Sequence, residues 1–153
     1  MKKSWLCLFG WIASFQVISF IIGNLHKPLL NSWYMHLQRS DLTPPGYLFG
    51  IVWPILYTLL AIAGYLLWQN RSLVTLRLVF IVQMLINWSW TTVFFRWHWM
   101  MMSWMMIIAM IVLSSAISMQ SYCRDRRISW LIAPYQVWLL FACYLNMYIW
   151  FYN

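Results

Sequence analysis

The chain has 153 residues, of which 64% are hydrophobic, 20% are aromatic and only 8% are charged. An ordinary soluble domain carries roughly a quarter charged residues. Ten Lys and Arg stand against two carboxylates, Asp41 and Asp125, which gives a formal net charge of +8. This composition excludes a disordered chain, a disulfide-stapled secreted module and a water-soluble globule. It predicts a small integral membrane protein.

Five apolar stretches are long enough to cross a bilayer core of about 30 Å, which needs roughly 20 helical residues. They cover about residues 4–25, 46–68, 74–95, 100–122 and 129–151. Such runs do not alternate apolar and polar residues as the strands of a barrel do. The predicted fold class is therefore all-α: a polytopic membrane protein, with residues 1–153 forming one bundle of five transmembrane helices.

Basic residues in the connections predict the orientation. Lys2 and Lys3 resemble the start of a signal peptide, but the apolar run after them is long and lacks a typical cleavage site, so we expect it to remain as an anchor. The N-terminus and the second and fourth connections together carry seven Lys and Arg, whereas the first and third connections carry three. The positive-inside rule then predicts a bacterial inner membrane protein with its N-terminus cytoplasmic and its C-terminus periplasmic. These short clusters face lipid head groups and do not indicate nucleic acid.

The first connection, about residues 26–45, is polar and long, which is typical of a lid or a binding loop. We interpret His26, His36 and His98 as solvated loop or turn residues rather than metal ligands. The three cysteines stand singly without CxxC spacing, so no metal site is predicted.

The second stretch begins with Pro44 and Pro45, which suit the first turn of a helix. Gly46 and Gly50 have the GxxxG spacing that lets another backbone approach closely. Three aromatic residues recur every four positions on one face: Phe49, Trp53 and Tyr57.

The third stretch places four side chains within about 60° of one another at 100° per residue: Gln83, Asn87, Trp90 and Phe94. Buried amides in hydrocarbon need partners. Two interpretations stay open, namely hydrogen bonding between helices, or a pocket wall that offers amide groups to a polar ligand edge.

The last two stretches differ in character. Seven of the eleven Met lie between Met100 and Met119, interspersed with Ser, and we interpret this stretch as facing lipid or a second copy of the chain. The fifth stretch carries one common face: Tyr135, Trp138, Ala142 and Asn146. Tryptophans well inside the spans suit a large, flat aromatic ligand.

Four blocks of residues follow one another along the chain: Trp33-Tyr34-x-x-Leu37-x-Arg39, Pro44-Pro45-Gly46-x-x-Phe49-Gly50-x-Val52-Trp53-x-x-x-Tyr57, Asn87-x-x-Trp90-Thr91-x-x-Phe94-Phe95 and Pro134-Tyr135-x-x-Trp138-x-x-Phe141-Ala142-x-x-Leu145-Asn146. Together they resemble the signature of the TspO/MBR family of tryptophan-rich sensory proteins and mitochondrial translocator proteins. Two positions depart from the family pattern: Leu42 replaces a frequent Trp, and Arg39-Ser40 replaces a Lys-Pro pair.

The resemblance implies a five-helix bundle, commonly a homodimer, whose pocket opens towards the first connection. It also implies porphyrins such as protoporphyrin IX or haem as ligands, with no cofactor required. The motif match assigns these residues to the pocket: Trp53, Asn87, Trp90, Trp138 and Ala142. On the same faces we expect further lining residues: Phe49, Tyr57, Gln83, Phe94 and Tyr135. The lid or mouth is expected to contain Trp33, Arg39, Pro44, Pro45 and Gly46.

The function predicted from the resemblance is a membrane receptor or carrier of tetrapyrroles with a regulatory or trafficking role and no catalytic residues. One alternative is an enzyme that degrades porphyrin in light, with Trp53 and Trp138 as redox-active residues. Another is a membrane scaffold that binds no ligand. The two departures lie in the expected lid and predict an altered ligand preference.

Overall fold

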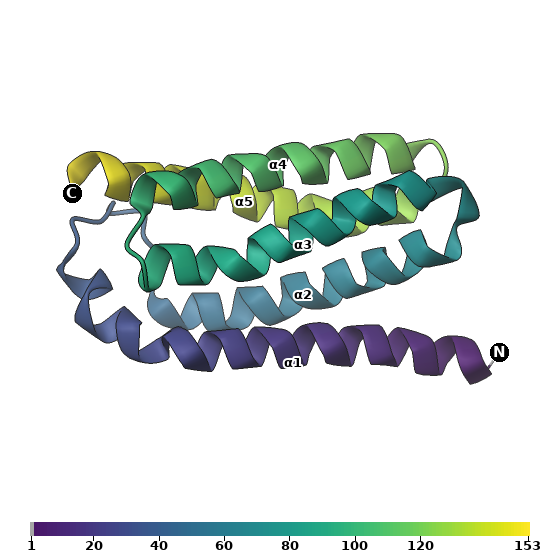
Figure 1. Cartoon of the computed structure of the whole chain (residues 1–153), viewed down its shortest axis with the longest axis horizontal. Helices are drawn as coiled ribbons and strands as arrows, with labels where there is room; N and C mark the ends of the chain where they lie inside the picture. The colour runs from purple at the N-terminus through teal and green to yellow at the C-terminus, as the bar shows by residue number, and fades with distance from the viewer. Residues whose placement is uncertain (1) are drawn as a thin grey trace.

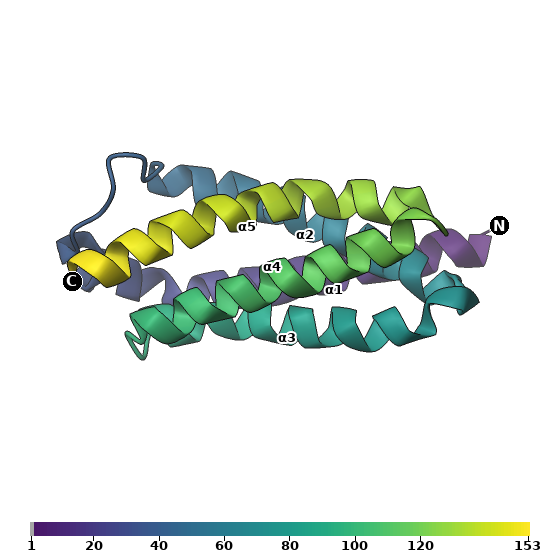
Figure 2. The same cartoon turned by 90° about the horizontal axis from the view of Figure 1, so that it is seen from above.

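The computed structural model describes residues 2–153, with all of their side chains except those of residues 2–4, 27 and 29–32. Five long helices run side by side along the molecule (Figure 1, Figure 2). They are α1 (Lys2–Ser32), α2 (Gly46–Gln69), α3 (Val74–Phe95), α4 (Met100–Tyr122) and α5 (Arg126–Tyr152). Each contains a segment long and apolar enough to cross a membrane. The predicted all-α bundle of five such helices is confirmed.

The helices pack as a ring in the order α1, α2, α5, α4, α3, with α3 returning to α1. Neighbours in the sequence are therefore not always neighbours in space. The short turns after α3 and after α4 keep α3, α4 and α5 adjacent, whereas α2 packs chiefly between α1 and α5. This order brings the predicted faces of α2, α3 and α5 towards one interior.

The bounds of α3 and α4 agree with the expected stretches, whereas α1 and α5 are longer. Asp125 explains the early start of α5, because its carboxylate accepts the backbone N–H of Arg127 at 3.1 Å and forms an ion pair with the Arg127 side chain at 2.9 Å. A capping carboxylate satisfies a helix donor that has no partner within the helix. The hydrogen bond from Arg127 also holds the pKa of Asp125 below its ordinary value.

Helix α1 continues seven residues beyond the expected end and includes Pro28. The prediction that His26 is a solvated loop residue is therefore wrong: its side chain is 7% exposed. The ring Nδ1 donates to the carbonyl of Ile22 at 2.8 Å, and Nε2 hydrogen-bonds with the Thr92 hydroxyl of α3 at 3.2 Å. The second bond joins α1 to α3. Part of the polar segment that suggested a loop therefore belongs to α1 and packs against another helix.

Within the described residues of one chain, nothing approaches Gly46 or Gly50 closely, so the predicted backbone approach stays a prediction for a second copy. A Cβ atom added at either position would meet nothing within 4 Å, because both glycines lie on the exposed surface of the first turns of α2. The tight approach occurs at Gly64 instead. A Cβ there would lie 2.6 Å from the Trp11 ring and 2.8 Å from the Phe80 ring.

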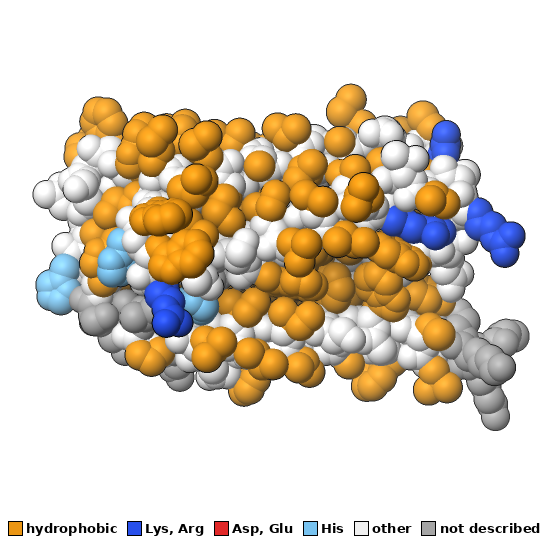
Figure 3. Space-filling view, viewed as in Figure 1, with side chains coloured by type: hydrophobic (Ala, Val, Ile, Leu, Met, Phe, Trp, Pro, Cys, Tyr) orange, Lys and Arg blue, Asp and Glu red, His pale blue; other side chains and the backbone are white. Residues whose placement is uncertain are grey.

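The two ends of the bundle differ in charge, and hydrophobic side chains cover the surface between them (Figure 3). At the end where α2 leads into α3, Arg77 donates to the carbonyl of Trp68 at 2.8 Å and to other carbonyls that end α2. The same end carries four further arginines: Arg71, Arg124, Arg126 and Arg127. The opposite end contains Arg39, Arg96 and the carboxylate of Asp41.

Candidate functional site

An aromatic cluster joins α2 to α5. The Trp138 ring of α5 lies 5.7 Å from Phe49 and 6.5 Å from Trp53, at interplanar angles of 77° and 82°. Trp53 also lies 5.4 Å from Tyr57, one turn further along α2. Phe49, Trp53 and Trp138 are half-buried. Because edge-to-face contacts cover the face of only one partner, the cluster leaves indole surface to which a flat apolar ligand can pack.

Below this cluster, a buried polar network connects four helices. The Tyr57 hydroxyl donates to Asn87 Oδ1 at 2.6 Å, and Asn87 Nδ2 donates to the Tyr135 hydroxyl at 3.0 Å. The Tyr135 hydroxyl in turn contacts the Met110 sulfur at 3.4 Å. In this conformation the Asn87 amide is therefore engaged in bonding between helices rather than directed at open space.

Gln83 lies one turn before Asn87 on α3 and differs from it in its hydrogen bonding. Its side chain is fully buried beside Tyr135. Neither its amide nitrogen nor its amide oxygen forms a hydrogen bond with the described residues. The Gln83 amide thus lies near the Tyr135 hydroxyl without reaching full hydrogen-bond geometry, and an amide left unpaired in an apolar interior costs free energy.

A second aromatic group lies on α3. Trp90 stacks on Phe94 with ring centroids 5.2 Å apart and planes 7° from parallel. The Trp90 indole N–H donates to the Ser103 carbonyl of α4 at 3.1 Å. No ring contact among the described residues joins Trp90 or Phe94 directly to Trp53 or Trp138. The predicted pocket residues therefore form two aromatic groups, and Ala142 packs half-buried against the core from α5.

The expected lid is a closing loop, residues 33–45, folded over the end of the bundle. Trp33 stacks on His98 with centroids 4.0 Å apart and packs against Phe94. Tyr34 packs against Phe94 as well, and the Arg39 guanidinium lies 5.2 Å from the Tyr34 ring centre. Burial raises the pKa of Tyr34, and the Arg39 charge offsets part of that rise. Arg39 is thus held at the loop rather than extended into solvent.

The same loop is fastened to α5 at its other side. Gln38 N–H donates to Asn153 Oδ1 at 3.0 Å, and Asn153 Nδ2 donates to the Gln38 carbonyl at 3.1 Å. The hydroxyls of Ser40 and Tyr144 lie 3.0 Å apart. Pro44 is half-buried, Pro45 caps α2, and Gly46 begins it. The loop therefore bridges α3 and α5 across the mouth of the bundle.

Replacing Asn153 with Ala is expected to increase the hydrogen-exchange rate of the Gln38 amide about fivefold, because a hydrogen bond of about 1 kcal/mol is lost. Asn153→Asp is the matched control, since it retains the oxygen that accepts from Gln38. Amide exchange followed by mass spectrometry measures both variants. Equal exchange of Gln38 in Asn153→Ala and in the unchanged chain would show that this contact does not hold the loop.

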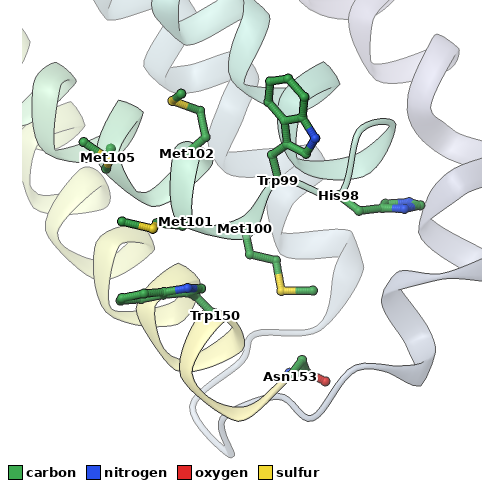
Figure 4. Close-up of a pocket in the computed structure, with 8 residues that line it drawn as sticks. All are labelled: His98, Trp99, Met100, Met101, Met102, Met105, Trp150 and Asn153. Carbon is green, nitrogen blue, oxygen red and sulfur yellow. The ribbon is translucent and has the colours of Figure 1, made fainter.

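An open cavity of about 710 Å³ lies beside this end of the bundle, between the start of α4 and the end of α5 (Figure 4). Its lining consists of His98, Trp99, Met100, Met101, Met102, Met105, Trp150 and Asn153. None of the residues predicted to bind ligand or to form the lid lines this cavity. One of its walls comes from the methionine-rich stretch that we interpreted as facing lipid or a second copy.

The family model described as the TspO/MBR family matches residues 10–151. The chain belongs to the TspO/MBR family. This confirms the family that the four sequence blocks predicted, and the matched region includes the aromatic cluster and the buried polar network described above.

Relatives in this family come from distant organisms. The chain is 31% identical to the tryptophan-rich protein TspO of Archaeoglobus fulgidus over 126 residues, which cover 81% of this chain and 82% of the relative. It is 29% identical to the human translocator protein over 126 residues, covering 77% and 73%. The TspO protein of Bacillus cereus is 24% identical over 148 residues, covering 95% and 94%.

Sequence reasoning missed the partners that α4 supplies to the site. Met110 contacts both Asn87 and Tyr135, and the Ser103 hydroxyl donates to Asn146 Oδ1 at 3.0 Å. A signal was present, because the buried residues of α4 repeat at spacings of four and three: Ser103, Ile107, Met110, Ser114, Ile117 and Ser121. That period marks a helix face that packs against neighbours throughout its length.

Proposed function

We propose that this member of the TspO/MBR family is a membrane receptor or carrier that binds tetrapyrroles such as protoporphyrin IX or haem, with a regulatory or trafficking role. The observation that carries the proposal is the meeting of Trp53 and Trp138, from two different helices, in an edge-to-face pair that stays half-buried. A macrocycle would stack on these indole faces. The family membership supports the same assignment.

The surrounding residues have distinct roles in this proposal. Tyr57 contacts Trp53 and donates to Asn87, so Asn87 positions the aromatic cluster rather than binding ligand directly in the closed state. Arg39 lies in the closing loop, where its charge would attract the propionate groups of a porphyrin. Because the loop packs against aromatic rings of α3 and is hydrogen-bonded to the α5 side, entry from this end requires these contacts to open.

We further propose that the protein resides in a bacterial inner membrane as a homodimer. The five arginines near the α2–α3 and α4–α5 turns support a cytoplasmic position for that end, because cytoplasmic connections carry an excess of Lys and Arg. The closing loop and the end of α5 would then face the periplasm. Labelling of Cys123, in the turn before α5, by a membrane-impermeant thiol reagent in spheroplasts would contradict this orientation.

Titration with protoporphyrin IX tests the binding proposal. We expect saturable binding, with Trp53→Leu and Trp138→Leu each raising Kd about 2- to 12-fold, because an aromatic contact contributes about 0.5–1.5 kcal/mol. Porphyrin absorbance is the measurement, since it does not depend on the number of tryptophans. Trp130→Leu is the matched control, because Trp130 lies on α5 but is 69% exposed.

The outcomes separate the three functions considered. Unchanged affinity in both Trp53→Leu and Trp138→Leu would overturn the assignment of the cluster as the site. Illumination of the bound complex separates binding from chemistry, because a new product that both variants fail to form would support porphyrin degradation. A folded protein that binds no porphyrin but co-purifies with a membrane partner would support a scaffold.

A further inference from the structure

The cavity in Figure 4 is rich in sulfur. Four of its lining residues are methionines from the first two turns of α4: Met100, Met101, Met102 and Met105. Three of them are about half exposed, at 52% for Met101, 47% for Met102 and 50% for Met105. The α5 side supplies the indole ring of Trp150, beside which the Met101 side chain lies. Four thioether side chains therefore line one open cavity together with an aromatic ring.

We propose that this cavity binds a soft monovalent metal cation, Cu⁺ or its redox-inert analogue Ag⁺, through methionine sulfur. Thioethers are soft ligands that select Cu⁺, whereas Mg²⁺ and Ca²⁺ prefer oxygen. The described residues that line the cavity include no Asp, Glu or Cys side chain. Thioethers carry no proton at any ordinary pH, so the metal does not compete with protons for these ligands.

Helix geometry allows two of the sulfurs to share one ion. Met101 and Met105 are four residues apart on α4, and side chains at this spacing have Cβ atoms about 5–6 Å apart on one helix face. The methionine side chain rotates about three bonds, so both sulfurs can turn towards an ion held between them. The Trp150 ring on the facing helix offers a cation–π contact to that ion.

Other groups at this end of the bundle bear on which atoms bind the metal ion and on how strongly it is repelled. The imidazole of His98 is directed away from the methionines in Figure 4, because its ring stacks on Trp33. We therefore assign the metal to thioether ligands alone. This end also has fewer arginines than the opposite end, and it carries Asp41. A cation consequently meets less repulsion here than near Arg71 and Arg127.

Titration of the detergent-solubilised protein with Ag⁺, read by NMR of ¹³C-methyl methionine, tests the proposal. The Met101 and Met105 methyl resonances are expected to shift and to saturate near one equivalent, whereas those of Met119 and Met147, which are exposed elsewhere on the surface, stay in place. A variant with Cys7→Ser, Cys123→Ser and Cys143→Ala removes the competing thiols. If it does not fold, the unchanged chain is titrated beyond three equivalents, which fill the thiols first.

A matched pair of double variants completes the test. Met101→Leu with Met105→Leu is expected to weaken Ag⁺ binding at least tenfold, while Met119→Leu with Met147→Leu leaves it unchanged. Circular dichroism and thermal unfolding establish that both variants fold alike. Parallel, non-saturating shifts of all exposed methionines, or saturable binding that survives in Met101→Leu with Met105→Leu, would overturn the proposal.

Discussion

Replacing Asn87 with Leu is expected to lower the free energy of unfolding by about 2–3 kcal/mol. Asn87 makes two hydrogen bonds to tyrosine hydroxyls, one on α2 and one on α5, and bonds of this kind in membrane helices have measured values of up to about 1.7 kcal/mol each. The replacement also leaves the Tyr57 hydroxyl buried without its acceptor, which adds a desolvation cost. Unfolding by heat or by denaturing detergent, followed by circular dichroism, measures the loss.

The control variant removes the Tyr57 and Tyr135 hydroxyls together with the Asn87 amide, so that no hydroxyl of this network is left without its partner. A chain carrying Asn87→Leu, Tyr57→Phe and Tyr135→Phe is expected to recover most of the lost stability, because replacing all the partners by apolar groups leaves no unpaired polar atom. In the double-mutant cycle, the variant with both Asn87→Leu and Tyr57→Phe should lose less stability than the sum of the two single losses. If the triple variant is less stable by the sum of the single losses, the three side chains do not act as one network.

A Gly64→Ala substitution should destabilise the bundle by about 1–3 kcal/mol, the usual cost of overpacking a filled interior. The new methyl group would lie 2.6 Å from the Trp11 ring and 2.8 Å from the Phe80 ring. Both rings belong to other helices and are packed among aromatic neighbours, so neither can move without disturbing further contacts. The expected result is a lower unfolding temperature and a changed near-ultraviolet tryptophan spectrum.

Gly50→Ala on the same helix is the matched control for Gly64→Ala. It meets nothing within 4 Å and replaces a helical glycine by a better helix former, so we expect it to be neutral or to stabilise by up to about 1 kcal/mol. Equal destabilisation by Gly50→Ala and Gly64→Ala would show that the close approach between α1, α2 and α3 does not limit the packing. A loss confined to Gly50→Ala would instead indicate an interface with a second copy.

The helices could be predicted because polar and charged residues in the local sequence mark where the apolar runs end. Arg96 and His98 interrupt the apolar runs between α3 and α4, and Arg124 and Asp125 do so before α5. The end of α1 could not be predicted from polarity, since His26 finds a partner on α3 that is 66 residues away in the chain. Likewise, the side-chain amide of Asn24 donates a hydrogen bond to the Phe20 carbonyl within α1. Both bonds make polar residues compatible with a continuing helix.

The faces of the candidate site were also predictable, whereas the partners were not. Helical periodicity aligned Trp53 with Tyr57 and Asn87 with Gln83, because it depends only on positions along one helix. Which helix each face meets depends on the order of packing around the ring, and periodicity carries no information about that order. The contact of Asn87 with Met110 follows from this order. So does the absence of a close neighbour at Gly46 and Gly50 within the described chain.

The ring order of the helices bears on how the protein is made. Helices α1 to α4 precede α5 in the chain and are synthesised before it, yet α5 is the helix that lies between α2 and α4. Until it enters the bilayer, the Asn87 amide lacks the Tyr135 hydroxyl and Trp53 lacks its partner Trp138. The contacts of α2 and of α4 with α5 therefore close the ring of helices. Closure of the bundle thus depends on the helix that is synthesised after its two neighbours in space.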